Sequence, residues 1–348
     1  KNINTIINKS LKNIDTGNQK KIDQILIDLD ATENKKKLGA NAILAVSLAA
    51  AKAEAISKKK ELYQHLGKKF ILPKPLMNII NGGAHADNNL RIQEFMIRPD
   101  SAKNFMDAIE KGFLVIKNLK KILKSKNFLV NVGDEGGFAP SINSNEEALD
   151  LIVDAIEKSK LKPGVDVSIC LDVAANELIN TDGKYSLNSS EFISVDKSIS
   201  YYKNLILRYP IKSIEDPFAE DDWSAWSKLT KEIGKNTQVV GDDLFVTNVK
   251  RLTRGIKEKS ANSILVKVNQ IGTLSETLDV IELAKNNNFS TIISHRSGDT
   301  EDTFIADLAV ATQSTQIKTG SLARSERVAK YNRLLRIEEQ LGKSSKIA

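Results

Sequence analysis

Cysteine is almost absent from this sequence, since Cys170 is the only one among 348 residues. A disulfide framework and a zinc site built from several thiolates are therefore excluded, and this usage fits a reducing compartment such as the cytoplasm. We expect Cys170 to be a small buried apolar residue. No apolar run approaches the roughly 20 residues that span a bilayer, and the opening KNINTIINKS lacks the apolar core of a signal peptide. The sequence therefore predicts no membrane span.

A strong excess of one charge sign is also missing. The 51 basic residues are interspersed with 44 acidic ones, and the formal net charge is +7. This balance permits anionic ligands, nucleic acid included, but favours nothing sharper. Because 41% of the residues are hydrophobic, intrinsic disorder is excluded, and the length suggests about two domains.

Proline is missing from the first 70 residues, which carry helical spacing of apolar residues, as in LGANAILAVSLAAAKAEAI. This opening is predicted to be purely helical. Pro73 and Pro75 break the pattern, and short β-branched runs then alternate with amphipathic helical stretches. We place a domain boundary there, with a helical part at 1–72 and a second domain at 73–348.

Short strands followed by helical stretches dominate the second domain, which indicates parallel strands with helical crossovers. The predicted strands span residues 165–172, 211–216, 237–243, 263–269, 290–295 and 315–320. The polar residues at their ends are Asp172, Glu215, Asp242, Lys267, His295 and Lys318. A closed (β/α) barrel assembles its site from such strand ends. An open doubly wound sheet binds at one switch point instead, and the sequence lacks the GxGxxG and GxxxxGK[ST] phosphate loops. A barrel is therefore favoured.

Three of these strand ends carry carboxylates, Asp172, Glu215 and Asp242. Converging carboxylates repel one another and resist ionisation unless a cation lies between them. Oxygen ligands without a nearby histidine or thiolate pair select Mg²⁺ or Mn²⁺ over Zn²⁺. The alternative is that acidic residues only cap the following helices, which explains one of them more readily than all three.

Two lysines, Lys267 and Lys318, lie at the same predicted mouth of the barrel. In the predicted strand at 263–269, Leu265 and Asn269 are expected to share the face of Lys267. A lysine beside a metal is pushed toward its neutral form and can then act as a general base. The alternative is a lysine at a strand edge whose charge reaches solvent. Lysines facing carboxylates suggest a site that removes a carbon-bound proton and stabilises the resulting negative charge.

Three loops carry further candidates. The glycine-rich loop NVGDEGGFAP at 131–140 offers Glu135 as an acid. In SHRSGDTED at 294–302, Arg296 and Ser297 suit a phosphate, and Asp302 is expected to cap the next helix. The loop NGGAHADN at 81–88 offers His85, although a single loop histidine more often has no catalytic role.

These segments belong to five longer motifs, NVGDEGGFAP, SIEDPFAEDDW, ILVKVNQIGTLSE, SHRSGDTEDTFIADL and QIKTGSLARSER. In this order, within residues 36–342, they resemble the bacterial-type enolase family, the phosphopyruvate hydratases of glycolysis and gluconeogenesis. The resemblance implies an α/β fold, a (β/α)8-type barrel whose first strands are partly antiparallel, with a helical remainder of an N-terminal capping domain. It also implies the Mg²⁺-dependent, reversible dehydration of 2-phosphoglycerate to phosphoenolpyruvate.

The resemblance assigns metal and base roles to the strand-end residues. Asp172, Glu215 and Asp242 are implied to bind the first of two Mg²⁺ ions. Lys267 is implied to take the C2 proton of the substrate, and Lys318 to hold the negatively charged intermediate together with the metal ions.

The resemblance assigns the acid and substrate-binding roles to the loops. Glu135, assisted by Glu94, is implied to protonate the departing C3 hydroxyl, and Arg296 and Ser297 to hold the phosphate. The other implied site residues are His295, counted as catalytic, and His85 and Gln93, which contact the substrate.

Family members also carry an opening segment with a small sheet and a serine loop, which closes on the site and ligates the second Mg²⁺. The sequence given begins at Lys1, within the helical part, so we expect that serine ligand to be missing and turnover to be slow. The resemblance further implies a cytoplasmic homodimer, and it allows secondary partners in an RNA-degradation complex or, after secretion, at the cell surface.

Two other hypotheses stay open at this point. One is a racemase or cycloisomerase of the wider superfamily, which usually lacks the GDEGG and SHRSG segments present here. The other is a non-catalytic interaction protein, motivated by the net charge of +7 and the missing opening.

Overall fold

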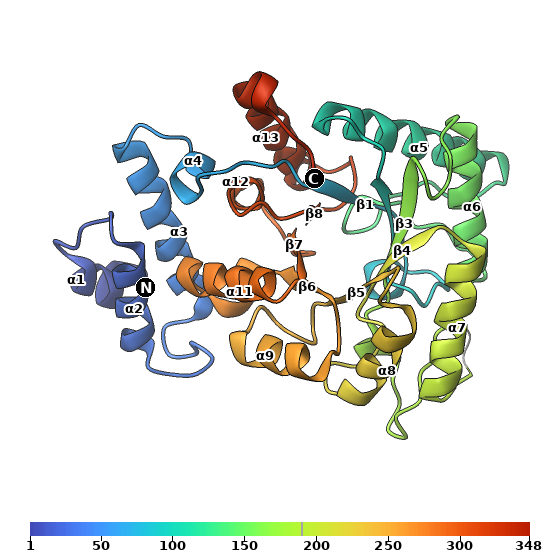
Figure 1. Ribbon diagram of the computed structural model, residues 1–348, viewed down its shortest axis with the longest axis horizontal. Helices are drawn as coiled ribbons and strands as arrows, with labels where there is room; N and C mark the ends of the chain where they lie inside the picture. Colours follow the sequence, from blue (N-terminus) through green and yellow to red (C-terminus); the bar gives the residue numbers. More distant parts are fainter. Residues whose placement is uncertain (189–190) are drawn as a thin grey trace.

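The computed structural model describes residues 1–188 and 191–348. Its first part is helical, as predicted (blue in Figure 1). The side chains at its centre are Ile7, Ile22, Leu26, Leu38 and Ile43, which form a small apolar core of their own. The elements are η1 (Ile3–Ile7), α1 (Asn8–Leu11), α2 (Gln19–Asp30), α3 (Ala40–Ser57) and α4 (Leu62–Leu66).

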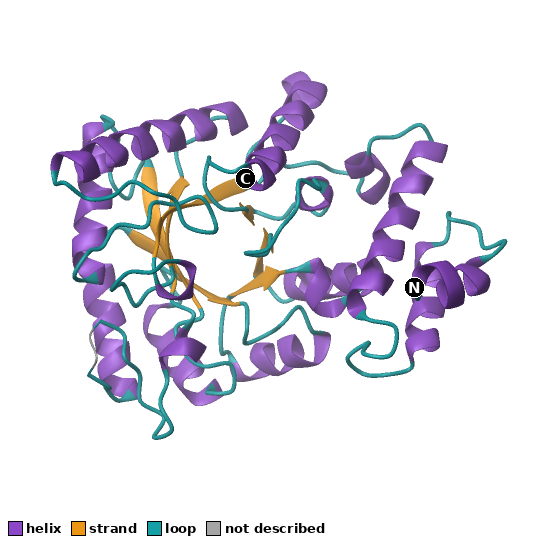
Figure 2. Ribbon diagram, turned by 180° about the vertical axis from the view of Figure 1, so that it is seen from behind, coloured by secondary structure: helices purple, strands orange, loops and turns teal. Residues whose placement is uncertain are grey.

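The second part is a closed barrel, which confirms the predicted fold class. Its strands are β1 (Lys74–Asn81), β2 (Glu94–Pro99), β3 (Val167–Asp172), β4 (Ile211–Glu215), β5 (Gln238–Gly241), β6 (Ser263–Val266), β7 (Ser290–Ser294) and β8 (Gln316–Lys318). They neighbour one another in chain order, and β8 pairs with β1 to close the ring. Strand β2 is antiparallel to both β1 and β3, and the remaining pairs are parallel. Figure 2 shows the ring of strands with helices around it.

Helices cover the outside of the ring, and most begin at a side-chain cap. Asn104, Ser144, Ser194, Asn248 and Thr273 each accept a hydrogen bond from a backbone N–H in the first turn of the following helix. The helices are α5 (Phe105–Ser125), α6 (Asn145–Lys158), α7 (Val195–Arg208), α8 (Trp223–Ile233), α9 (Val249–Glu258), α10 (Val268–Ile271), α11 (Leu274–Asn286), α12 (Phe304–Ala311) and α13 (Ser325–Leu341). Short turns of helix are η2 (Gly83–His85), η3 (Ala175–Leu178) and η4 (Gly342–Ser344).

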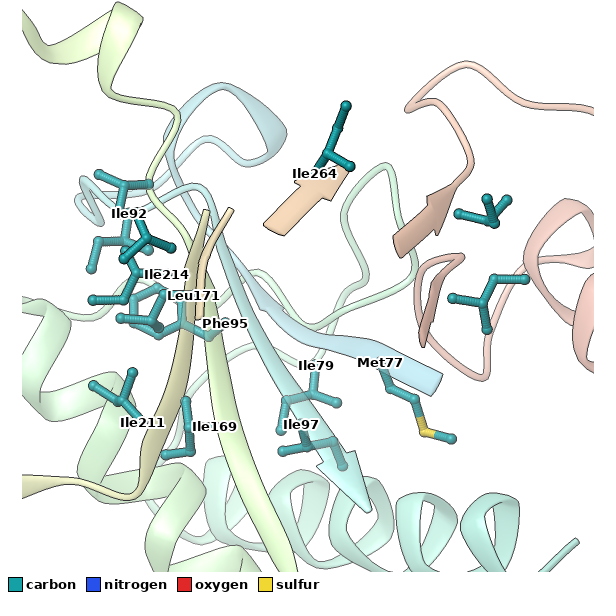
Figure 3. Close-up of a cluster of buried hydrophobic side chains, with 14 of the residues drawn as sticks. Met77, Ile79, Ile92, Phe95, Ile97, Ile169, Leu171, Ile211, Ile214 and Ile264 are labelled. Carbon is teal, nitrogen blue, oxygen red and sulfur yellow. The ribbon is translucent and has the colours of Figure 1, made fainter. Parts of the chain in front are cut away.

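Alternation along the strands separates two apolar layers. On β3, Ile169 and Leu171 face outward into the large core between strands and helices, part of which Figure 3 shows. Cys170 faces the interior and is fully buried, as predicted. The interior layer consists of Leu76, Met96, Cys170, Val240, Leu265 and Ile292. Polar side chains at the carboxyl ends of the parallel strands lie directly above this apolar floor.

Several predicted strands end earlier than expected, since β5 ends at Gly241 and β8 at Lys318, and the difference is largest for the predicted strand at 263–269. We expected Lys267 and Asn269 to lie on a strand at 263–269, but β6 ends at Val266 and α10 begins at Val268. Thr247 Oγ1 accepts a hydrogen bond from the backbone N–H of Lys267 at 2.9 Å, so this amide is not available to extend the strand. Lys267 is therefore the first residue after the strand, and the shared face with Asn269 was wrong.

Helix α3 qualifies the prediction that no segment could span a membrane. By length and composition alone this helix is long and apolar enough to cross a membrane, and 28% of it is buried inside the structure. One helix of this kind is only weak evidence for a membrane span. Its buried side makes polar contacts, since Ser47 Oγ accepts from the N–H of Leu274 at 2.9 Å and Glu54 accepts from Thr16 at 2.7 Å. In the structure, α3 thus connects the helical part to the N-terminal end of α11.

Candidate active site

The predicted site residues gather at one mouth of the barrel, around a cavity of about 90 Å³. The predicted residues that line it are His85, Gln93, Glu94, Glu135, Asp172, Asp242, Lys267, His295, Arg296, Ser297 and Lys318, and Ser294 completes the lining. Glu215 does not line the cavity but contacts Lys318, which does. The structure therefore brings all of these residues together, because the carboxyl ends of parallel barrel strands share one face.

Lys318 lies among three of the carboxyl groups at this mouth of the barrel. Glu94, Asp172 and Glu215 lie in register on neighbouring strands β2, β3 and β4. Lys318 Nζ lies 2.8 Å from Asp172, 2.8 Å from Glu215 and 3.2 Å from Glu94, and all of these side chains are buried. Burial alone lowers the pKa of a lysine, but here the carboxylates outweigh burial and hold the pKa of Lys318 well above its usual value.

Lys267 forms an ion pair with Asp242. The other oxygen of Asp242 accepts a hydrogen bond from Gln270 Nε2 at 2.8 Å, so the carboxylate is held from two sides. Burial opposes the charged lysine, but Asp242 prevails and raises the pKa of Lys267. The sequence predicted a lysine pushed toward its neutral form by a metal. On the charges of the protein alone, the direction is the opposite, because the nearest charged group is a carboxylate.

Asp216 is a site residue that the sequence analysis missed. It is buried directly after β4, with φ of 42°, and accepts the backbone N–H groups of Asp242 at 3.0 Å and Asp243 at 2.9 Å. It thereby fixes the turn that presents Asp242. Burial, together with Asp242 and Asp243, raises the pKa of Asp216 well above its usual value. Its adjacency to Glu215 in SIED was the available signal.

The charge balance of the site fits a divalent cation. Among the described residues, six buried carboxyl groups lie here, while the lysines beside them are Lys318, which is buried, and Lys267, which is partly buried; the carboxyl groups are those of Glu94, Glu135, Asp172, Glu215, Asp216 and Asp242. Glu94 Oε2 and Glu215 Oε2 are buried without a hydrogen-bond partner in this part of the chain. Burial, followed by Asp172, raises the pKa of Glu215 well above its usual value. Buried oxygens with excess negative charge are the donor set that Mg²⁺ prefers.

The described residues contain two groups of candidate metal ligands, and within each group the ligand atoms lie within 4.8 Å of one another. They are Asp216, Asp242 and Asp243, and His85, Glu94 and Glu135. The predicted trio of Asp172, Glu215 and Asp242 is not one of these groups, and Lys318 bonds both Asp172 and Glu215. The first group shares Asp242 with the predicted trio.

The acid side of the site combines Glu94 with the loop that carries Glu135. His85 Nδ1 lies 3.6 Å from Glu94 and 3.9 Å from Glu135, while its Nε2 lies 2.9 Å from Ser297 Oγ. Burial and the charge of Glu135 raise the pKa of Glu94 well above its usual value. Burial opposes ionisation of Glu135 too, but His295 and Lys318 hold its pKa well below the usual value. The surroundings therefore favour the protonated form of Glu94 and the ionised form of Glu135.

Glycines bring the loop at 131–140 close to the barrel. Gly136 has φ of +84°, a conformation that disfavours other residues. At Gly137, an added Cβ would meet Asn81 Oδ1 at 2.5 Å and the carbonyl oxygen of Asn78 at 3.0 Å. Asn78 also donates a hydrogen bond to Glu135 at 3.3 Å. The absence of side chains at these glycines thus lets the loop place Glu135 over the strand ends.

The loop after β7 places the predicted phosphate ligands. Arg296 and Ser297 are exposed, next to His295, which is buried. As expected, Asp302 accepts the N–H of Phe304, the first residue of the next helix, at 2.8 Å. Arg327 of α13, which the sequence analysis missed, contacts this loop from behind, through His295 and two backbone carbonyl groups. Arg327 lies three and four residues before Lys330 and Tyr331, a spacing that places all three on one buried face of the helix. This spacing is the sequence feature that could have indicated it.

Comparisons with known proteins agree with this geometry. Residues 1–66 match the family model described as the N-terminal domain of enolase, and residues 69–348 match that of its C-terminal TIM barrel domain. The enolase of Pelagibacter ubique (strain HTCC1062) is 63% identical over 348 residues, which covers 99% of this chain and 83% of that relative. With two family models covering nearly the whole chain and this identity over its length, the chain belongs to the enolase family.

Proposed function

We propose that the cavity at the carboxyl ends of the strands performs the reaction of the family, the reversible dehydration of 2-phosphoglycerate to phosphoenolpyruvate. As a member of this family, the chain is a phosphopyruvate hydratase, a carbon–oxygen lyase. The observation that carries the site assignment is the arrangement of base and acid. Lys267 follows β6 and Glu94 begins β2, four strands away in an eight-stranded ring, so they face each other across the mouth.

We infer that Asp172, Glu215 and Asp242 hold a Mg²⁺ ion. Their oxygens, two of them on adjacent strands in register, are of the type that this ion prefers. When bound, the ion supplies positive charge that neutralises these carboxylates and polarises the carboxylate of the substrate. Arg296 and Ser297 are proposed to hold the phosphate, and His85 and Gln93, which line the same cavity, to contact the substrate.

Lys267 is proposed to remove the C2 proton. A lysine accepts a proton only when it is neutral, and its ion pair with Asp242 favours the charged form. Base function therefore requires that Asp242 be engaged by positive charge other than Lys267. Lys318, fully buried and positively charged, is proposed to stabilise the negative charge that develops on the substrate.

Glu94 and Glu135 are proposed to supply the proton for the departing C3 hydroxyl. Because the pKa of Glu94 is raised and that of Glu135 is lowered, the pair favours a single proton held on Glu94. His85 lies within 4 Å of both carboxyl groups and connects them to Ser297. The proton is thus stored inside the site, where water has little access.

The test is exchange of the substrate C2 proton with solvent deuterium, followed together with phosphoenolpyruvate absorbance. We expect Lys267→Met to lower exchange by about 10²- to 10⁴-fold, the usual contribution of a general base. Lys228→Met is the control, since Lys228 is exposed and lies 3.7 Å from Asp196 on the surface. Exchange at the unchanged rate in Lys267→Met would show that another group takes the proton.

We also propose the arrangement that the resemblance implies around this site. Residues 1–72 form the helical part of a capping domain on the barrel at 73–348, and the chain works as a cytoplasmic homodimer. Secondary partners, an RNA-degradation complex or a cell surface, stay predictions motivated by the net charge of +7. Filter binding at rising salt tests the RNA case, since contacts with phosphates weaken steeply with salt.

A further inference from the structure

Arg327 is a fully buried cation beneath the active site. Its Nη1 donates to His295 Nδ1 at 2.6 Å and to the carbonyl oxygen of Arg296 at 2.6 Å. Its Nη2 donates to the carbonyl oxygens of Ser297 and, at 3.1 Å, of Asp134. The nearest carboxylate oxygen recorded for it, on Glu326, lies 3.7 Å from Nε. The two NH₂ groups are therefore satisfied by one imidazole and by backbone carbonyl groups of the loops at 131–140 and 294–302, whereas Nε is buried without a hydrogen-bond partner among the described residues.

The contact with His295 determines where the imidazole carries its proton. A guanidinium has only donors and keeps its charge in proteins, so a ring nitrogen that it contacts must accept. His295 Nδ1 is therefore unprotonated, and a neutral ring then carries its proton on Nε2. His295 is buried, and burial lowers its pKa, which agrees with a neutral ring.

The other ring nitrogen faces the acid side of the site. His295 Nε2 lies 3.3 Å from Glu135 Oε1. The charged groups that act on the ring are Glu135 from the loop at 131–140, Lys318 from β8 and Arg327 from α13. Nε2 makes no hydrogen bond of normal geometry with a described residue, and of these three groups only Glu135 is an acceptor. An N–H on Nε2 is therefore directed at Glu135 across 3.3 Å, whereas an N–H on Nδ1 would meet Arg327.

We propose that Arg327 is a positioning residue for the dehydration, which fixes His295 as the tautomer with its proton on Nε2 and so directs a hydrogen-bond donor at Glu135. The inference rests on the proposed function for the role of Glu135, which with Glu94 forms the pair proposed to supply the proton. The tautomer itself rests on the geometry alone. Through the carbonyl of Asp134, the same guanidinium also holds the residue next to Glu135, so one side chain aligns both partners.

The experiment is nitrogen NMR of the ligand-free full chain labelled at histidine. The chain has three histidines, so the signals of His295 are assigned by elimination with His65→Gln and His85→Gln. We expect His295 to show one protonated and one acceptor-type nitrogen at pH 7, with the proton on Nε2. A proton on Nδ1, or a doubly protonated ring, in the unmodified chain overturns the proposal whatever any variant does.

Two substitutions separate the tautomer from general support of the fold. Arg327→Lys keeps a donor-only cation, so we expect the Nε2 tautomer to persist, while Arg327→Met removes the donor and allows the Nδ1 tautomer. Arg333→Met is the matched control on the same helix, because Arg333 bonds Asp307 and Glu61 away from the site. An unchanged His295 spectrum in folded Arg327→Met would show that Arg327 does not fix the tautomer, which refutes the proposal.

Activity distinguishes this proposal from the proposed function. If both are right, Arg327→Met lowers kcat at least tenfold more than it raises KM, and Arg327→Lys recovers part of kcat. If the chain shows no hydratase activity but His295 has the Nε2 tautomer, the proposed function fails and the assignment of the tautomer stands. If the chain is an active hydratase but His295 has the Nδ1 tautomer, the proposed function stands and the assignment of the tautomer fails.

Discussion

Substitution of Lys318 by methionine removes the cation that pairs three buried carboxylates. The ammonium group lies 2.8 Å from Asp172, 2.8 Å from Glu215 and 3.2 Å from Glu94. Removing one partner of a buried ion pair destabilises a protein by about 3–5 kcal/mol, because the remaining charge is left buried. Native proteins are stable by about 5–15 kcal/mol, so the expected loss is a large share of the total.

The expected loss depends on pH, because carboxyl groups without a cation avoid the penalty by taking up protons. Lys318→Met should therefore destabilise the chain more at pH 8 than at pH 5. Mg²⁺ should restore part of the stability at pH 8, since a cation that binds only the folded state stabilises it. Without Mg²⁺, we expect Lys318→Met to lower the free energy of unfolding by about 3–5 kcal/mol at pH 8.

Urea unfolding followed by tryptophan fluorescence measures this loss, since Trp223 and Trp226 are both buried. Lys203→Met is the control, because Lys203 lies 2.7 Å from Glu232 but both side chains are nearly half exposed, at 46% and 44%. An exposed pair is worth about 0.2–1 kcal/mol. Equal losses for the two variants, or a loss in Lys318→Met that does not change with pH, would contradict the reasoning.

Three further predictions concern the same site. Glu94 and Glu215 have raised pKa values in the folded chain, so the folded state holds protons that the unfolded state releases above the ordinary pKa of 4.5. The free energy of unfolding without Mg²⁺ should therefore fall as pH rises from 5 to 8. Urea midpoints that rise over this range would contradict this prediction. Asp216→Asn, which leaves one acceptor oxygen for two backbone N–H groups, should lower the free energy of unfolding by about 1–3 kcal/mol and weaken Mg²⁺ binding in calorimetry, whereas exposed Asp221→Asn should do neither. Gly137→Ala should destabilise by about 1–3 kcal/mol through contact with Asn81 and the Asn78 carbonyl, whereas Gly298→Ala, with open space around it, should stay within about 0.5 kcal/mol in the same unfolding assay.

The barrel and the gathering of the site could be predicted because both follow from short-range rules. Strands with a period of two and helical crossovers place Asp172, Glu215 and Lys318 at one mouth, whatever the side chains elsewhere do. The sequence analysis listed no strand for β1 or β2. In β1, seven of eight residues are buried, and in β2 five of six, so neither strand shows the alternation of a half-buried strand.

The features that the sequence could not show depend on contacts between distant segments. Strand β6 ends before Lys267 because of a hydrogen bond to Thr247, 20 residues away along the chain. The pairing of Lys318 with two proposed metal ligands depends on closure of β8 against β1. Arg327 became a site residue only when α13 packed behind the loop after β7. Local sequence patterns do not predict such contacts between distant segments, so the roles of the individual side chains stay predictions.

The site connects stability to function in a specific direction. Below it, six apolar side chains close the barrel interior, so the carboxylates above have water on one side only. In the protein alone, Lys318 and Lys267 are held in the charged form by the groups we propose as metal ligands. A cation bound by these carboxylates would therefore act twice, by relieving their repulsion and by weakening the hold of Asp242 on the proposed base. The same charge imbalance that destabilises the barrel thus means that Lys267 would remove a proton only when a cation engages Asp242.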